Sequence, residues 1–272
     1  MIRNLLILSG VAVFGLAITS PATAGGEWGA YEVGDIRSGY TYAAPETRAI
    51  QDDDFENPGF IWVDYGEEIW SDVDGEAGKS CESCHGDASV MKDGVTGMQG
   101  VATKYPVYSK ALGKPINIEQ QINRCRELNM KAAPYKWESK ELLSMTAYVK
   151  SQSRGMPLNV DVSGVMEPFF EKGKDFYFQR RGQLDLSCAN CHVDNPGNMI
   201  RANLLSMGMA NGFPTYRLKW QKPGSLHRRF RGCNKQVRAK PYSNGSDEYV
   251  NLEVFLTHRG NGLPIETPSV RN

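Results

Sequence analysis

Apolar residues recur at helical spacing in two segments, one near the middle of the chain and one near its end. The positions are Leu142, Met145 and Val149 in the first segment, and Val250, Leu252 and Leu256 in the second. This spacing predicts helices over 139–151 and 246–258 whose apolar faces belong to a core. A serine begins each segment as the predicted N-cap, with acidic residues in the first turn. Further helices are predicted over 66–71 and 169–180, so we expect a mainly α-helical protein.

The first apolar run of the chain has a different character. A short positive start precedes the apolar stretch 5–18, and Ala22-Thr23-Ala24 has the small-residue pattern of a cleavage site. The stretch is short for a bilayer span, which needs roughly 20 residues; a retained membrane anchor is the alternative. No later stretch of sequence is apolar for long enough to cross a membrane. We therefore expect residues 1–24 to be a signal peptide cleaved after Ala24, and the mature chain to be exported without stable membrane insertion.

Two CxxCH motifs lie far apart in the chain, at 81–85 and 188–192. Two thiols at this spacing reach both vinyl groups of a haem, and the histidine that follows lies under the iron. A zinc site would need a second pair of ligands near each motif, and the sequence offers none. We therefore predict two covalently bound c-type haems, attached at Cys81, Cys84, Cys188 and Cys191, with His85 and His192 on the iron atoms. An exported c-type cytochrome indicates the bacterial periplasm.

An internal repeat relates the two motifs. A shift of 107 positions carries the first motif onto the second, and nearly the same shift relates residues along the rest of both halves. Matched pairs include Gly66 with Gly173, Trp70 with Tyr177, Pro106 with Pro214, Cys125 with Cys233, Pro134 with Pro241, and Gly155 with Gly262. One single-residue insertion and one deletion account for the changes of register. We interpret the chain as a tandem duplication of one haem-binding domain.

The repeat sets the predicted domain organisation. Each copy has a helix before the motif, a long irregular stretch rich in Gly and Pro, a lone cysteine, and a closing helix. This plan predicts two tandem cytochrome c-like domains, at 56–158 and 165–272. An acidic, irregular lead-in at 25–55 precedes them, and residues 159–164 are the expected linker.

The lone cysteine of each copy is the candidate second axial ligand of its haem. Cys125 and Cys233 occupy matched positions, so each is expected to act within its own domain. A disulfide between them is the alternative. Other residues compete as ligands but have no matching ligand in the other copy: Met130, Met156, Met207, Met209 and His227. A thiolate ligand stabilises ferric iron, so both reduction potentials should be low.

Charge distinguishes the two copies. Residues 195–246 contain no Asp or Glu and ten Lys or Arg, five of them within five positions of Cys233. A solvated basic face, or arginines that bind haem propionates, would explain such a run. The functional interpretation is a basic pocket that attracts a small anion and lowers the pKa of a thiol. Arg229, Lys235 and Arg238 are the candidate anion-binding residues, because forked guanidinium donors suit oxyanions. The net formal charge of +0 does not indicate a particular kind of partner, and we expect no binding to nucleic acid.

The chain resembles the SoxA family of dihaem cytochromes, the cytochrome subunits of SoxAX complexes of bacterial thiosulfate oxidation. The features that carry the resemblance are the two CxxCH motifs, the lone cysteine after each, and the C-terminal segments 231–239, 245–249 and 262–271. The resemblance covers essentially the whole mature chain. It implies that the chain pairs with SoxX, a smaller monohaem cytochrome c. It also implies that the pair joins thiosulfate oxidatively to a cysteine of the carrier SoxYZ, as an L-cysteine S-thiosulfotransferase.

The same resemblance implies roles for individual residues. Cys233 would be the catalytic residue, carried as a persulfide intermediate, and Arg229 would bind substrate. His85 and Cys125 would ligate the first iron, and His192 and Cys233 the second. Joining thiosulfate to a thiol releases two electrons, which suits a protein with one-electron haem acceptors.

Three other functions remain open from the residues alone. The main one is a non-catalytic dihaem electron carrier, which leaves the basic cluster unexplained. A dihaem peroxidase needs a displaceable ligand on iron, and two matched cysteines argue against one. A haem-thiolate redox sensor would lose its sulfur ligand on reduction.

Overall fold

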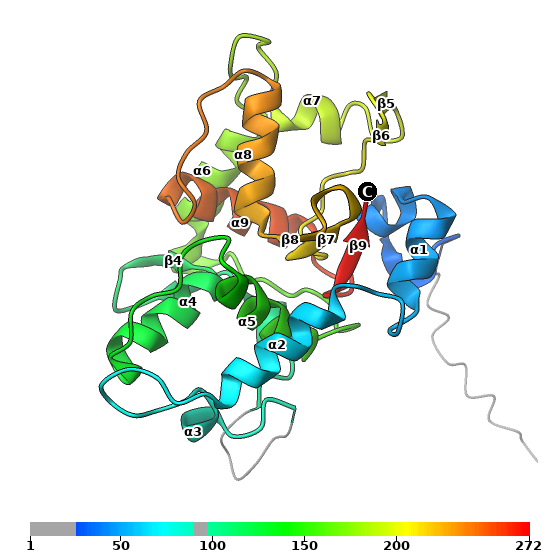
Figure 1. The fold of residues 1–272 in the computed structure, drawn as a ribbon. Helices are drawn as coiled ribbons and strands as arrows, with labels where there is room; N and C mark the ends of the chain where they lie inside the picture. The colour runs from blue at the N-terminus through cyan, green and yellow to red at the C-terminus, as the bar shows by residue number, and fades with distance from the viewer. Residues whose placement is uncertain (1–25, 90–96) are drawn as a thin grey trace, which may run out of the picture.

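The computed structural model describes residues 26–89 and 97–272. The predicted signal peptide, including its cleavage site after Ala24, lies outside the described residues. Two haem-binding domains lie one above the other in Figure 1, with the N-terminal segment beside the C-terminus. Within the described ranges, no helix has the length and apolarity needed to cross a bilayer.

Each domain is built on one pair of crossing helices. α2 (Phe60–Ser71) packs on α5 (Lys140–Ser151), and α6 (Glu167–Phe178) packs on α9 (Asp247–Arg259). The matched glycines make both crossings possible. A Cβ on Gly66 would lie 2.3 Å from the Ser144 carbonyl oxygen, and one on Gly173 would lie 1.9 Å from that of Asn251. The repeat seen in the sequence is therefore also a repeat of packing.

The closing helices begin where the sequence predicted. The Ser139 hydroxyl accepts a hydrogen bond from the Leu142 backbone N–H at 3.2 Å, and that of Ser246 accepts one from Tyr249 at 3.4 Å. These caps satisfy backbone donors that the first turn leaves free. The helices before the motifs differ from the predicted ranges in two ways. α2 ends at Ser71 as predicted but begins earlier, at Phe60, whereas α6 runs from Glu167 to Phe178 and is shifted as a whole toward the N-terminus.

The part of each stretch that directly precedes and includes the lone cysteine is regular, and there the expectation of an irregular chain was wrong. Each copy forms a hairpin there, followed by a helix that carries the cysteine. The elements are β3 (Val107–Ser109), β4 (Lys114–Ile116) and α4 (Ile118–Cys125) in the first domain, and β7 (Thr215–Arg217), β8 (Lys222–Gly224) and α8 (Leu226–Gln236) in the second. The two hairpins have equivalent registers, with Tyr108 opposite Pro115 and Tyr216 opposite Pro223. Side-chain caps at Asn117 and Ser225 begin the two helices.

The remaining elements are short. α3 (Glu82–His85) and α7 (Cys188–His192) carry the motifs, and the strands β5 (Met199–Ile200) and β6 (Asn203–Leu204) form a hairpin after the second. Single turns of 3-10 helix lie at Gly29–Tyr31, Gly39–Tyr42, Val101–Lys104, Gly164–Met166 and Leu218–Trp220, and a π-helical turn lies at Arg126–Met130.

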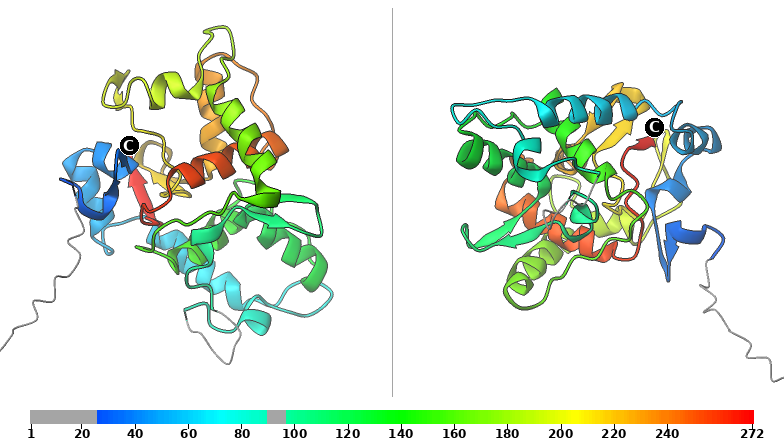
Figure 2. Two further views of the ribbon diagram at one scale, coloured as in Figure 1. Left: turned by 180° about the vertical axis from the view of Figure 1, so that it is seen from behind. Right: turned by 90° about the horizontal axis from the view of Figure 1, so that it is seen from below.

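The acidic lead-in is also more ordered than expected. It forms the strands β1 (Glu32–Val33) and β2 (Ile36–Arg37) and the helix α1 (Pro45–Asp52), which packs beside β9 (Ser269–Arg271). β9 itself adds to β7 in parallel. Figure 2 shows the same contact from behind, between α1 and the C-terminal strand. The lead-in is therefore attached to the second domain.

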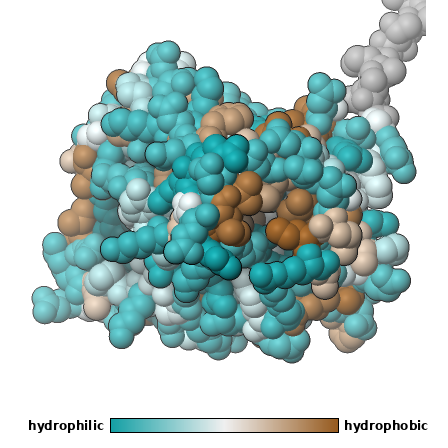
Figure 3. Space-filling model, turned by 90° about the horizontal axis from the view of Figure 1, so that it is seen from above, coloured by the Kyte–Doolittle hydropathy of each residue, from teal (hydrophilic) through white to brown (hydrophobic). Residues whose placement is uncertain are grey.

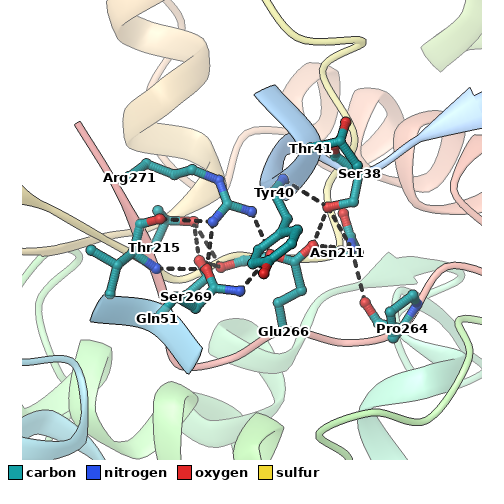
Figure 4. A network of polar contacts seen from close by, with 12 residues as sticks. Ser38, Tyr40, Thr41, Gln51, Asn211, Thr215, Pro264, Glu266, Ser269 and Arg271 are labelled. Atoms are coloured by element: carbon teal, nitrogen blue, oxygen red, sulfur yellow. Dashed lines mark hydrogen bonds and ion pairs between the residues drawn. The ribbon is translucent and has the colours of Figure 1, made fainter. Parts of the chain in front are cut away.

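A buried polar network makes that attachment (Figure 4). The Glu266 carboxylate is at its centre, and it accepts hydrogen bonds from Ser38 of the lead-in and from Asn211 at 2.8 Å. Arg271 forms an ion pair with the same carboxylate. The Gln51 side-chain oxygen of α1 accepts from the Val270 backbone N–H at 3.0 Å. Because buried polar groups are costly without partners, this network fixes the position of the C-terminal strand.

Candidate functional site

The motif helices are set by local hydrogen bonds. The Ser187 hydroxyl accepts from the Asn190 backbone N–H at 3.3 Å, and the Asn190 side chain accepts from the Ser187 N–H at 3.0 Å. This capping box begins α7 at Cys188, and the short helix holds Cys188, Cys191 and His192 together. In the first domain, the Ser80 hydroxyl accepts from the Ser83 N–H at 3.0 Å.

The ring of His192 is held on two sides. Its Nδ1 donates to the Ser206 carbonyl oxygen at 2.7 Å, which leaves the Nε2 lone pair free to bind a metal. Gly208, with φ +73°, lies against the imidazole so closely that a Cβ there would be 2.8 Å from the ring. A glycine at this position therefore lets the backbone support the ring face.

Cys233, which belongs to α8, lines a cavity of about 350 Å³. The walls also include both motif cysteines, His192 and apolar residues, among them Phe176, Phe230, Leu252 and Leu256. Figure 3 shows apolar side chains around a hollow, amid a mostly hydrophilic surface. His192 lies close enough to Cys233 to affect the pKa of its thiol. Burial alone would raise the pKa of Cys233, but the Arg229 guanidinium and His192 outweigh it and lower that pKa to about 7.

Of the arginines and lysines that line this cavity, Arg229 and Arg217 are the two whose charge lowers the pKa of Cys233. Arg229 precedes Cys233 by one helical turn and lines the cavity with it, and Arg217 enters from the end of β7. Arg217 is 8% exposed, and burial together with the neighbouring Arg229 lowers its pKa to about 10. Its Nε donates to the Asn272 backbone oxygen at 2.5 Å. No local signal in the sequence distinguishes Arg217 within the basic run, because its position at the cavity depends on the hairpin.

Other members of the basic run lie elsewhere. The structure does not bring Lys235 and Arg238 to the cavity: both are exposed, and neither is among the lining residues. Arg228 lies 3.6 Å from the Glu138 carboxylate and over the Trp220 ring, and Arg231 donates to the Tyr242 carbonyl oxygen. The run therefore divides into four residues that line the cavity, namely Arg201, Arg217, Lys219 and Arg229, and others that act in packing or on the surface.

In the first domain, the candidate ligand Cys125 lies near the motif cysteine Cys81. Burial raises the pKa of Cys81 to about 11, and the nearby Cys125 contributes to that increase. The side-chain amide of Gln121 donates to the Cys125 sulfur at 3.2 Å. Burial lowers the pKa of His85, whose ring lies 5.8 Å from that of Trp70. Arg126 here forms an ion pair with Asp74 at 2.6 Å and covers the Tyr135 ring.

The alternatives for the lone cysteines can now be compared. All six cysteines are free, so Cys125 and Cys233 are not joined by a disulfide. His227 binds Glu253 and stacks on Trp137, away from the cavity. Met209 lines the cavity, but Cys233 is the sulfur that faces His192. The cavity of the second domain fits a covalently bound haem. Its wall contains the two motif thiols and apolar side chains, and an imidazole faces a thiol across it.

Comparison with known proteins agrees with this architecture. The family model described as SoxA/TsdA, cytochrome c domain, matches residues 65–158 and again 172–265. The chain belongs to the SoxA/TsdA cytochrome c family. The prediction of two tandem cytochrome c domains with two c-type haems is therefore confirmed.

Relatives within the family are close over most of their length. An L-cysteine S-thiosulfotransferase subunit SoxA from Pseudaminobacter salicylatoxidans is 47% identical over 86% of this chain and 80% of the relative. One with the same name from Rhodovulum sulfidophilum is 43% identical, over 88% and 81%. A crystal structure of SoxXA from P. pantotrophus superposes with a TM-score of 0.82 at 40% identity, covering 87% of each chain. The resemblance to SoxA in the sequence is therefore confirmed.

Proposed function

We propose that this chain is the SoxA subunit of an L-cysteine S-thiosulfotransferase, which joins thiosulfate oxidatively to a cysteine of a carrier protein. The observation that carries the proposal is the second-domain cavity, where Cys233 faces His192 beside Arg229. The names of close relatives support the enzyme class. The alternative, a non-catalytic dihaem carrier, gives no reason for a thiol and two arginines in one cavity.

The overall reaction balances with one proton and two electrons released. The terminal sulfur of thiosulfate and the sulfur of a thiol form one S–S bond, and the thiol proton leaves. When bound, the two haems supply one-electron acceptance. Cys188 and Cys191 would hold the second haem covalently, with His192 and Cys233 on its iron. Cys81 and Cys84 would hold the first, with His85 and Cys125 on its iron.

Cys233 is the proposed carrier of sulfur between steps, as a persulfide. Its thiolate would form the persulfide by taking the terminal sulfur of a thiosulfate, whose S–S bond breaks and releases sulfite. The environment of Cys233 favours that chemistry, because neighbouring cations lower its pKa and increase the thiolate fraction near neutral pH. A thiolate is the nucleophilic form of cysteine, and covalent attachment divides one difficult step into two.

Arg229 and Arg217 are the proposed anion-binding residues. Thiosulfate is a dianion with oxygen acceptors, and guanidinium groups in a partly buried cavity offer forked donors to it. Lys235 and Arg238 were the other candidates. Their exposed positions fit a weaker role, in attracting anions or partners to this face.

The proposed partners are a SoxX-like monohaem cytochrome c, which removes electrons, and the carrier SoxYZ, whose cysteine accepts thiosulfate. The superposition on a chain of a SoxXA crystal structure supports the first. The proposed location is the periplasm.

The Arg229→Ala variant tests the anion-binding role. We expect kcat/KM for thiosulfate to fall by roughly 10²-fold, because a charge-assisted hydrogen bond contributes about 1.5–3 kcal/mol. Steady-state reduction of the partner cytochrome, with a carrier thiol as acceptor, measures it. The matched control is Lys235→Ala, also on α8 but outside the cavity, which should stay within about twofold of wild type. An equal loss in both variants would contradict a specific role for Arg229.

A further inference from the structure

A cluster of ionisable side chains is buried where the two domains meet. Glu119 of α4 and Lys150 of α5 come from the first domain, and His227 of α8 and Glu253 of α9 come from the second. Glu119 is 8% exposed, and the side chains of His227 and Glu253 are 1% and 12% exposed. We call these four residues the interdomain cluster. His227 was a competing ligand candidate in the sequence, but neither it nor the other three residues line the haem cavity of the second domain.

Three members of the cluster, Glu119, Lys150 and Glu253, line a small internal cavity, whose wall also contains matched positions of the two domains. Its volume is about 10 Å³, close to the least that holds one water molecule. Under the shift of 108 that relates Cys125 to Cys233, its lining residues form pairs: Ala102 with Ala210, Tyr105 with Phe213, and Ile118 with Leu226. The same shift relates Glu119 to His227. The duplication therefore placed an acid and an imidazole at equivalent positions, and the interface brings both into one cluster.

The hydrogen bonds assign the proton positions of the second-domain pair. The His227 Nδ1 accepts from the Gly245 backbone N–H at 2.9 Å, so its Nε2 carries the proton and donates to Glu253 at 3.0 Å. The Asn117 amide donates to the same Glu253 oxygen, also at 3.0 Å. Burial alone would raise the pKa of Glu253, but these donors keep that pKa below its usual value. Glu253 is therefore the ionised carboxylate of the cluster.

Glu119 is the group that can change its charge. With His227 neutral, two carboxylates and the Lys150 ammonium leave one negative charge in excess. Burial and the charge of Glu253 raise the pKa of Glu119 to about 7. Burial also lowers the pKa of Lys150. Besides these groups, Tyr105 is the titratable side chain that lines the small cavity. A proton on Glu119 removes the excess charge.

The cluster lies one layer of side chains from each haem site. Leu226 and Phe213 line both the small cavity and the haem cavity of the second domain. On the other side, Tyr105 lines the small cavity, and burial, with a further contribution from the nearby Cys125, raises the pKa of its phenol. An electron that enters either domain therefore adds negative charge close to the cluster, through side chains that screen it little.

We propose that the interdomain cluster is a redox-linked proton site, which binds one proton from solvent when an electron enters the haem-binding domains and releases it when the electron leaves. The added electron and the bound proton cancel in charge. The proton resides on a Glu119 carboxylate oxygen. The negative charge of Glu253 raises the proton affinity of this carboxylate, and the positive charge of Lys150 lowers it. The site would couple electron flow through the protein to pH, independently of the chemistry at Cys233.

Redox titration of the holo-protein over about pH 5 to pH 9 tests the proposal without thiosulfate. We expect the midpoint potential of at least one haem to fall as pH rises through neutrality, since the reduced state binds more protons. The Glu119→Gln variant, which keeps the shape of the side chain, should lose this slope. The matched control Glu171→Gln, at an exposed carboxylate paired with Lys174, should keep it.

A second variant covers the case in which Glu119→Gln does not fold. Lys150→Met removes the cation that favours an ionised Glu119, so the window of pH dependence should move to higher pH. Potentials of the wild type that do not change with pH would overturn the proposal. So would an unchanged slope in Glu119→Gln, which would place the titrating group elsewhere, at a haem ligand or propionate. Neither result would bear on the proposed thiosulfate chemistry.

Discussion

Thiosulfate-dependent electron transfer should fall by roughly 10³-fold or more in the Cys233→Ala variant, because the thiol is the proposed site of covalent sulfur transfer. The change removes the sulfur that faces His192 and leaves Arg229 and Arg217 in the cavity wall. The measurement is reduction of the partner cytochrome by thiosulfate in the presence of a carrier thiol.

The matched control is Cys125→Ala, at the equivalent position of the first domain. It also removes a predicted haem ligand, but no cavity arginine accompanies Cys125 in the way that Arg229 accompanies Cys233. We expect this variant to keep turnover within about tenfold of wild type. If Cys233→Ala turned over thiosulfate as well as Cys125→Ala did, the non-catalytic electron carrier would be the better account.

The Gly173→Ala variant should lower the free energy of unfolding by about 3 kcal/mol, the upper part of the usual range for overpacking. The added Cβ would lie 1.9 Å from the Asn251 carbonyl oxygen, which belongs to helix backbone and cannot rotate away. α6 and α9 would have to separate, and this helix pair holds the second domain together. Denaturant unfolding of the holo-protein, followed by circular dichroism, measures the change.

Gly232→Ala is the control for helix propensity. Gly232 lies within α8, and a Cβ there would meet no atom within 4 Å. Alanine is the better helix former by about 1 kcal/mol, so this variant should be as stable as wild type or more so. A similar loss of stability in both variants would contradict the role of the close helix crossing.

The sequence predicted the repeat, the motifs and the closing helices because those signals are local or periodic. Ser139 and Ser246 mark helix starts through bonds to residues three positions away. The repeat matched Cys125 to Cys233, but the sequence analysis did not predict α4 and α8, the helices that carry them. The Asn117 and Ser225 caps were a usable signal for α4 and α8, but it was hidden in a stretch rich in Gly and Pro.

The position of a basic residue in the repeat does not by itself determine whether its side chain reaches the cavity. Arg229 precedes Cys233 by four positions and so shares its helix face, whereas Lys235 follows it by two and lies on another face. Arg238 lies beyond the end of α8, with φ +58°. Arg217 reaches the cavity only because β7 pairs with β8 and β9. Such long-range pairing has no local pattern in the sequence.

The lead-in differs from its prediction as an irregular segment because its partners also lie far away in the sequence. Its acidic composition suggested irregular chain, but Ser38 and Gln51 find partners more than 200 positions away, in Glu266 and Val270. These bonds stabilise α1 against β9, and through β9 they support the strand that carries Arg217. Tertiary contacts here outweigh weak local preference.

The intact mass of the mature protein, before and after treatment with thiosulfate and a reductant, would show both the haem content and any sulfur bound to Cys233. We expect the mass of residues 25–272 plus two covalently bound haems, with a removable addition of one sulfur atom that maps to the peptide containing Cys233. Cys233→Ala should keep both haems and lose that addition. A mature chain with fewer than two haems, or extra sulfur that maps to a peptide other than that of Cys233, would contradict the account.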